Sequence, residues 1–338
     1  MRNVKILEDM LSTGMRSVTL ENDKLTVVVL PDNGADIYSV EYKPKNRVNV
    51  LFQSPSGPRR LPTIFDSGNS EEQWMDRYYG GWNYMFPNMG AACSYKGASM
   101  GFHGEASVVP WQYELVEEEE GVSLRLTTTL LRTPFILEKT ISLGIGADSF
   151  LIHDRITNYS EVSVDYIWGQ HIAFGAPLLG GGSRLTVPSD KLEVEPFPEG
   201  SDLSACRIPA GIQGWPIVKD FDGKDIDLSK MPPENNRSAD MSYLTGMREG
   251  WYELVNDELG LGARVEWDLE AYPYVWLWQE FKGTLTYPFY GSYYVMGVEP
   301  SSTPLSGGLE AAVKGGYARQ LGPKESHETS TSMRLFER

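Results

Sequence analysis

The feature that most constrains the fold of this chain is a succession of short runs in which apolar and polar residues alternate, separated by turn residues. Alternation with a period of two is typical of β-strands with one buried face, because successive side chains point to opposite sides of a strand. No amphipathic helix longer than a few turns separates these runs. We therefore predict an all-β protein built as one large antiparallel sandwich. The expected strands cover residues 17–21, 24–30, 36–42, 111–116, 122–131, 135–143, 149–157, 164–174, 247–255, 261–267, 274–281, 292–298 and 329–336.

Two long segments interrupt the strand pattern. Residues 53–81 and 195–240 lose periodicity and collect proline and charged residues. Segments of this length are too long for tight connections, so we expect structured loops that border a site. No change in composition marks a domain boundary, and large β-sandwiches can exceed the usual domain length. We predict a single domain over residues 1–338.

Composition excludes several classes of partner. The formal net charge of −16 disfavours nucleic acid and anionic membrane surfaces, because both would repel the chain. Residues 1–14 carry scattered charges and no continuous apolar run, so we expect neither a secretory signal nor a membrane span. Cys93 and Cys206 are far apart and form no disulfide or metal-type pattern. A cytoplasmic protein is expected.

One carboxylate stands at the end of an apolar run. Residues 293–298 are uncharged, and Glu299 follows them directly before Pro300. Proline cannot donate to a strand ladder, so we expect pairing to stop there and the carboxylate to lie at a strand end. Rigid strand ends often present chemistry, although an acidic residue at a turn can also simply face solvent.

The chain has only four histidines, so each can be judged separately. His103 lies between glycines that allow close approach of a ligand, and His171 lies among apolar residues that would exclude water. His153 is expected to be a surface or structural residue, and His327 to be solvated. His103 and His171 could each be hydrogen-bonded core residues. Together with Glu299, however, they would supply the acid and the base that a proton-transfer reaction needs.

An aromatic strand offers a surface for a flat ligand. Trp276 and Trp278 alternate with Val275 and Leu277, so the two indoles share one face of the strand. They could be core residues on a strand buried on both sides. They could also form an apolar platform beside polar groups such as Gln279, which would suit a sugar ring.

Several ordered segments resemble the aldose 1-epimerase (galactose mutarotase-like) superfamily. They are FPNMG at 86–90, GFHGE at 101–105, HIAFG at 171–175, YVWLWQE at 274–280 and GVEP at 297–300. The resemblance implies a β-supersandwich with a concave face that binds a monosaccharide. It also implies interconversion of the α and β anomers of an aldose, without a cofactor or metal.

The resemblance also implies roles for particular residues. Glu299 corresponds to the general base that takes the anomeric hydroxyl proton, His171 to the acid that protonates the ring oxygen, and His103 to a second histidine near the reacting centre. Asp240 corresponds to a sugar-binding aspartate, and Asn88 falls within the early motif. Asn88, Asp240, Trp276 and Gln279 are thus the predicted substrate-binding residues.

The early motif lacks the arginine that many members carry, and Arg59 or Arg77 could replace it from the preceding loop. The identity of the sugar, its phosphorylation and the oligomeric state are left open by the sequence.

Three other functions compete with this one. A non-catalytic sugar-binding protein would use the same aromatic platform without turnover, because function resides in the site and not in the fold. A metal-dependent cupin-like enzyme would use His103, Glu105, His171 and Glu299 as ligands. A glycoside hydrolase would use two carboxylates, with Glu280 and Glu299 as candidates.

Overall fold

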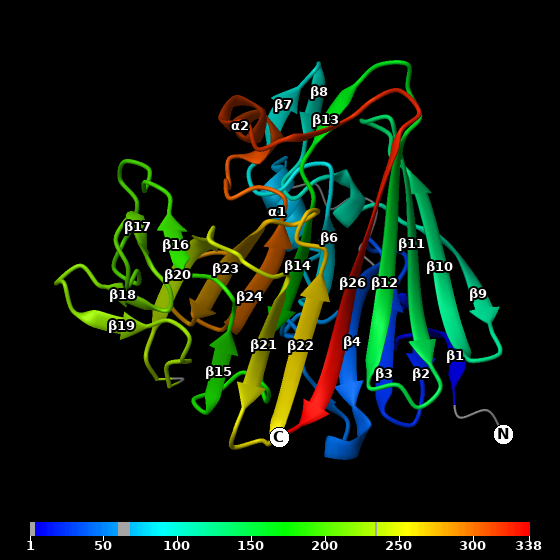
Figure 1. Cartoon of the computed structure of the whole chain (residues 1–338), viewed down its shortest axis with the longest axis horizontal. Coiled ribbons are helices and arrows are strands. Elements are labelled where there is room, and N and C mark those ends of the chain that lie inside the picture. The colour runs from blue at the N-terminus through cyan, green and yellow to red at the C-terminus, as the bar shows by residue number, and fades with distance from the viewer. Residues whose placement is uncertain (1–3, 60–67, 234) are drawn as a thin grey trace.

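A computed structural model describes residues 4–59, 68–233 and 235–338. Two large antiparallel sheets dominate these residues and pack against each other (Figure 1). The predicted all-β antiparallel sandwich is therefore confirmed. The expected loop at 53–81 is described only in part, since residues 60–67 lie outside the described ranges.

Twelve strands of the described residues form the larger sheet. Its order is β1 (Lys5–Met10), β2 (Arg16–Glu21), β3 (Leu25–Leu30), β4 (Asp36–Tyr42), β6 (Trp82–Met85), β14 (Gly169–Phe174), β24 (Tyr294–Ser301), β23 (Tyr274–Phe281), β20 (Ser238–Leu244), β16 (Lys191–Val194) and β17 (Gly211–Gly214), with β5 (Val48–Asn49) paired to β4.

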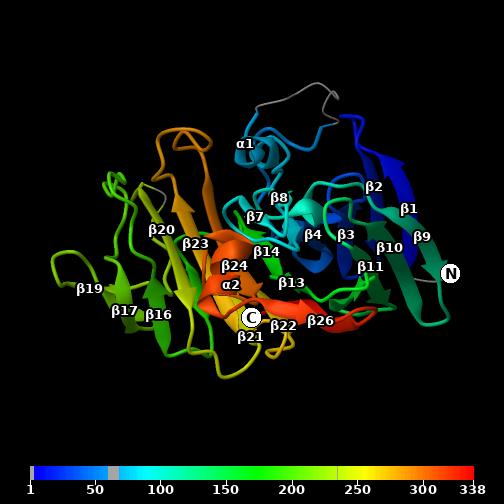
Figure 2. The same ribbon diagram turned by 90° about the horizontal axis from the view of Figure 1, so that it is seen from above.

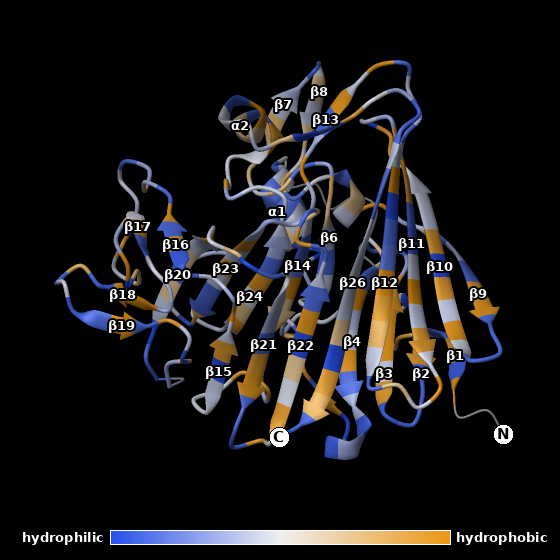
Figure 3. Cartoon of the chain, viewed as in Figure 1, coloured by the Kyte–Doolittle hydropathy of each residue, from blue (hydrophilic) through white to orange (hydrophobic). Residues whose placement is uncertain are grey.

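Eight strands of the described residues form the second sheet. Its order is β15 (Ser183–Thr186), β21 (Trp251–Asn256), β22 (Leu261–Trp267), β26 (Ser326–Glu337), β12 (Ser149–Asn158), β11 (Phe135–Gly144), β10 (Gly121–Thr129) and β9 (Gln112–Glu117). Apolar and polar residues alternate along β11 and β12, as Figure 3 shows, and the burial of their side chains alternates in step. This is the pattern of a sheet with one face in the core.

Short elements complete the fold. Among the described residues they are the pairs β7 (Cys93–Tyr95) with β8 (Ala98–Met100), β13 (Val164–Tyr166) with β25 (Arg319–Leu321), and β18 (Ile217–Lys219) with β19 (Asp225–Asp227), together with helices α1 (Ser70–Met75) and α2 (Gly308–Gly315) and the 3₁₀ turns η1 (Lys43–Lys45) and η2 (Glu105–Ser107). Elements α2, β7, β8 and β13 gather at one end of the sheets, whereas β16 to β19 lie at the side opposite β1 and β9 (Figures 1 and 2).

The main hydrophobic core lies between the two sheets. It combines residues of the larger sheet, such as Leu277 and Val298, with residues of the smaller sheet, such as Leu137 and Val265. Because side chains alternate along a strand, the neighbours of Leu277 and Val298 project from the other face of the larger sheet. That outer face carries the candidate site.

One expected strand is divided into two. Residues 164–174 form β13 and β14, which belong to different sheets. The residues between them bond elsewhere: the Ile167 N–H donates to the Pro87 carbonyl, and the Trp168 N–H donates to the Ser302 hydroxyl. These bonds direct the chain out of one ladder and into the next, which a continuous apolar run cannot reveal.

Two further expectations need correction. Strand β24 does not stop before Pro300, because Pro300 pairs with Val275 and Ser301 with Tyr274. On its other side, β24 has no registered partner in β14 between Gly297 and Ser301, so a missing N–H is tolerated there. The segment 195–240 is not wholly irregular, since it contains β17, β18 and β19.

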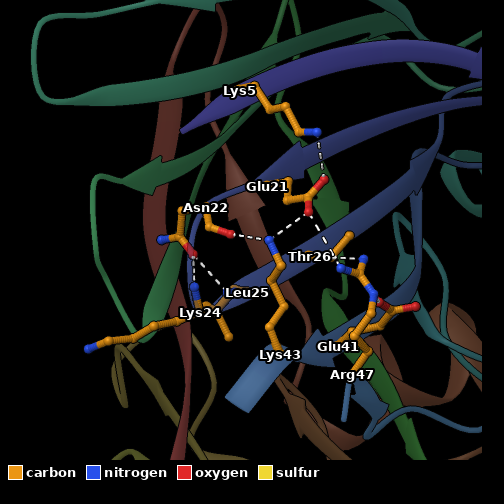
Figure 4. A network of polar contacts seen from close by, with 9 residues as sticks. All are labelled: Lys5, Glu21, Asn22, Lys24, Leu25, Thr26, Glu41, Lys43 and Arg47. Atoms are coloured by element: carbon orange, nitrogen blue, oxygen red, sulfur yellow. Dashed lines mark hydrogen bonds and ion pairs between the residues drawn. The ribbon is translucent and has the colours of Figure 1, made fainter. Parts of the chain in front are cut away.

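A polar network secures the start of the larger sheet (Figure 4). Glu21 at the end of β2 accepts a hydrogen bond from Lys43 at 2.6 Å, and Lys5 and Arg47 lie 3.2 and 3.5 Å from its carboxylate. Partial burial would raise the pKa of Glu21, but the hydrogen bonds from Lys43 and Lys5 outweigh it and leave the pKa below its ordinary value. Glu21 is therefore a carboxylate fully compensated by cations.

No helix in the described part of the chain is long and apolar enough to cross a membrane.

Candidate active site

A cavity of about 590 Å³ opens on the outer face of the larger sheet, over β14, β23 and β24. Ligand sites commonly have volumes of this order. His103, His171 and Glu299, which are far apart in sequence, all line it. The remaining lining residues are Glu71, Trp74, Met75, Tyr78, Gly90, Ala91, Phe102, Pro198, Met241, Trp276, Trp278, Phe289 and Ser306.

Glu299 lies beneath the cavity and is 2% exposed, so it does not face solvent at a turn. Its side chain extends over Gly297, where a Cβ atom would stand 2.2 Å from Glu299 Oε1. Glycine is therefore required two positions before the carboxylate. No residue in the described ranges donates a hydrogen bond to this carboxylate, and burial raises the pKa of Glu299 well above its ordinary value.

His171 is the nearest titratable partner of Glu299. Its Nε2 atom lies 3.6 Å from Glu299 Oε1, and the side chain projects from β14 opposite the core-facing Gln170 and Ile172. Burial lowers the pKa of His171 to about 4. Burial thus favours the uncharged forms of both groups, which are a protonated Glu299 and a neutral His171.

His103 approaches the same region from a loop. Its backbone has a φ of 56°, and its Nδ1 atom accepts a hydrogen bond of 3.0 Å from the Gly90 N–H. A nitrogen that accepts cannot carry the proton, so neutral His103 is protonated at Nε2. Burial, reinforced by His171, lowers the pKa of His103 well below its ordinary value. His103 is therefore a neutral hydrogen-bond donor.

Aromatic rings wall the cavity around the two histidines. Trp74 stacks on Tyr78 with ring centroids 4.9 Å apart, and Tyr78 meets His171 edge-on at 5.4 Å. The Tyr78 hydroxyl is buried without a hydrogen-bond partner among the described residues. The ring of Tyr78 therefore lines the cavity, while its hydroxyl is enclosed in the protein.

Sequence reasoning missed Trp74, Tyr78, Phe102, Met241 and Phe289. Trp74 and Tyr78 come from α1 and the turn after it, within a segment that has no periodic signal. Trp276 and Trp278 do line the cavity from β23, so the structure places both predicted indoles on the same face.

Asp240 and Gln279 are not brought to the cavity. They are directly paired across β20 and β23, and Arg207 joins them through bonds of 2.6 Å to Asp240 Oδ2 and 2.6 Å to Gln279 Oε1. Gln279 is adjacent to Trp278, so strand alternation puts its side chain on the opposite face. The alternation of Trp278 and Gln279 along the strand can be seen in the sequence. The structure therefore places Asp240 and Gln279 outside the lining of this cavity, and their contact with a ligand stays a prediction.

Asn88 is also absent from the cavity wall. Its amide donates to the carbonyls of Ala91 and Gly101, and its oxygen accepts from the Leu309 N–H at 2.6 Å. These bonds tie the His103 loop to the start of α2. Asn88 therefore positions the loop and has no spare group for a ligand.

The two expected arginines lie elsewhere. Arg59 and Arg77 line a different cavity, together with Arg16 and Asp32. None of the described residues that line the Glu299 cavity is a lysine or an arginine.

The other carboxylates that could compete with Glu299 are occupied. Glu105 accepts bonds from the Leu131 and Arg132 amides and anchors that turn. Glu280 accepts bonds from the Gly283 N–H at 2.8 Å and the Thr284 hydroxyl at 2.6 Å. No group of three histidine, cysteine or acidic side chains in the described ranges is arranged to hold a metal ion.

The remaining histidines lie outside the cavity. His153 is exposed and lies near Ser330 and Glu328, in agreement with a surface role. His327 is not fully solvated, because it is half-buried beside Trp168 and within 2.6 Å of the Tyr166 hydroxyl.

The fold is similar to that of galactose mutarotase-like proteins. A galactose mutarotase-like protein from Clostridium acetobutylicum superposes with a TM-score of 0.68 at 13% identity, covering 99% of both chains. A Klebsiella pneumoniae protein provisionally named an aldose 1-epimerase gives a TM-score of 0.70 at 17% identity, covering 98% of this chain and 83% of its own. An Escherichia coli protein with the same provisional name gives a TM-score of 0.64 at 15% identity, covering 96% of this chain and 100% of its own.

The chain belongs to the family described as DUF4432, a domain of unknown function, whose model matches residues 12–206 and 228–335. No curated protein matches the sequence.

Proposed function

We propose that this protein is an isomerase that interconverts the α and β anomers of a sugar by opening and closing its ring. The observation that carries the proposal is the buried pair of Glu299 and His171, 3.6 Å apart in a cavity walled by aromatic rings. Such a pair can accept one proton and donate another at adjacent oxygens of a hemiacetal. The names of the structural neighbours support the same chemistry.

The roles follow from what each group can do when a sugar is bound. Hydroxyl groups of the sugar donate to the Glu299 carboxylate and stabilise its charged form, so the proton that burial holds on Glu299 passes to His171. Glu299 then takes the proton of the anomeric hydroxyl while His171 protonates the ring oxygen, and the ring opens to an aldehyde. Rotation about the adjacent carbon bond and reclosure give the other anomer.

His103 and Tyr78 would assist without exchanging protons. The Nε2–H of neutral His103 can donate to an oxygen near the reacting carbon, and the ring of Tyr78 would pack beside the sugar. Trp276 and Trp278 would pack against the apolar face of the ring. Orientation of the sugar between these groups supplies the remaining advantage through proximity.

Exchange spectroscopy by NMR on a panel of free and phosphorylated aldoses tests the proposal. We expect the wild type to accelerate anomer exchange of at least one aldose over buffer, and Glu299→Gln and His171→Gln each to lose roughly 10²- to 10⁴-fold in kcat/KM. His153→Gln, a matched change at an exposed histidine, should keep wild-type activity. Undiminished exchange in Glu299→Gln would remove the mechanism, and sugar binding without exchange by the wild type would indicate a binding protein.

A further inference from the structure

The polar groups available to a ligand are confined to one end of the cavity. Glu299 lies 3.6 Å from His171, and the rings of Tyr78 and His103 lie 5.4 and 5.5 Å from the ring of His171. Glu299, His171 and His103 can serve the reacting carbon and its neighbouring oxygens, and Tyr78 contributes its ring. A sugar with hydroxyls all around its ring needs further partners on the other walls.

Part of the other walls presents carbon, because the polar hydrogens of two lining side chains are already used. Trp276 Nε1 donates to the Thr303 carbonyl at 2.6 Å, and the Ser306 hydroxyl donates to Glu195. The neighbouring lining residues Met241 and Phe289 have no hydrogen-bonding group comparable to an amide or hydroxyl. Hydroxyls placed against these walls would lose water without gaining a partner.

Three polar side chains suited to bind hydroxyls face away from the cavity. Arg207 donates hydrogen bonds to Asp240 and Gln279 on the core-facing side of the larger sheet, and none of the three lines the cavity. Anionic groups are disfavoured as well, since the described lining residues include Glu71 and Glu299 but no lysine or arginine. The cavity therefore selects against both extra hydroxyls and phosphate.

We propose that the substrate is an uncharged deoxysugar, bound with its reacting carbon at Glu299 and His171 and its hydroxyl-poor part against Met241 and Phe289. This inference rests on the proposed function and adds the class of substrate. It distinguishes the site from one built for a fully hydroxylated or phosphorylated hexose.

The test compares matched sugars on the wild-type protein. Anomer exchange is measured by NMR for D-galactose and D-fucose, for D-glucose and 6-deoxy-D-glucose, and for D-mannose and 6-deoxy-D-mannose, with the three hexose 6-phosphates as charged probes. We expect at least one 6-deoxy sugar to have a kcat/KM roughly 10- to 100-fold above that of its parent hexose. No 6-phosphate should be accelerated.

The outcomes separate this inference from the proposed function. The inference would be overturned if, in every pair, the parent hexose exchanged at least as fast as its deoxy partner. Efficient exchange of a 6-phosphate would overturn it as well. Either result would leave the proposed function intact. Absence of acceleration for every sugar would overturn both.

A variant locates the preference in the cavity wall. Met241→Gln keeps the length of a partly buried side chain and adds an amide, so the ratio of deoxy to parent activity should fall severalfold toward one. Met10→Gln makes the same change at a residue 55% exposed and outside this cavity, and it should leave the ratio unchanged. An unchanged ratio in a folded Met241→Gln protein would contradict the assignment of the apolar wall.

Discussion

Glu21 and Glu299 lie on strands of the same twelve-stranded sheet of the described residues, but in opposite electrostatic environments. Glu21 is surrounded by Lys5, Lys43 and Arg47, and its pKa is lowered (Figure 4). Glu299 lies in an aromatic cavity with one uncharged histidine nearby, and burial raises its pKa. The difference teaches that one carboxylate secures the sheet, whereas the other is left without a cation at a cost in stability, as the proposed proton transfer requires.

Among the changes that leave both glutamates in place, the largest effect should come from moving the Glu299 carboxylate. In Gly297→Ala the new Cβ atom would lie 2.2 Å from Glu299 Oε1 and must displace it. We expect kcat/KM for anomer exchange to fall by about 100-fold, since misplacement by about 1 Å can have an effect of this size. The measurement is the NMR exchange assay with the sugar that the wild type turns over.

Gly181→Ala is the matched control for that change, because its added Cβ atom meets no atom within 4 Å. It should retain wild-type activity. Full activity in a folded Gly297→Ala protein would show that the position of this carboxylate does not govern turnover.

A smaller effect should appear in stability, with opposite signs at the two glutamates. Glu299→Gln removes a buried acid that has no compensating cation, so we expect the free energy of unfolding at pH 7 to rise by roughly 1 kcal/mol. Glu21→Gln removes a carboxylate bound by cations, and the free energy of unfolding should fall by about 0.5–1 kcal/mol. Urea unfolding followed by fluorescence measures both. Changes of the same sign would contradict the contrast between the two sites.

These differences in the free energy of unfolding should also change with pH. The folded-state pKa of Glu299 lies above its ordinary value of 4.5, so the folded protein holds the extra proton and this group makes stability fall as pH rises from 4.5 to the folded pKa. The advantage of Glu299→Gln should therefore grow over that interval, by at most about 1.4 kcal/mol per pH unit.

The folded-state pKa of Glu21 lies below 4.5, so its contribution is complete above pH 4.5 and is lost as pH falls through the folded pKa. The defect of Glu21→Gln should accordingly shrink in acid. Urea unfolding of the wild type and both variants between pH 4 and 8 provides the measurement. Parallel pH profiles for the two variants would refute the assigned pKa directions.

The fold class and the three titratable residues that line the cavity could be predicted from the sequence. Period-two alternation reveals which residues share a strand face, so the sandwich and the common face of Trp276 and Trp278 could be predicted. The ordered motifs around His103, His171 and Glu299 pointed to side chains that the structure brings together at one cavity. Their proposed roles as base and acids await the variants described above.

Other features depended on contacts between distant segments. Tertiary packing brings Arg207 into hydrogen bonds with Asp240 and Gln279, and it joins Asn88 to the start of α2. It also brings Trp74 and Tyr78 to the cavity. Local sequence determines which face of a strand a side chain occupies. Only the folded chain decides which residues of other segments lie on that face. They determine whether a carboxylate has cations beside it, as Glu21 has, or lies without one, as Glu299 does.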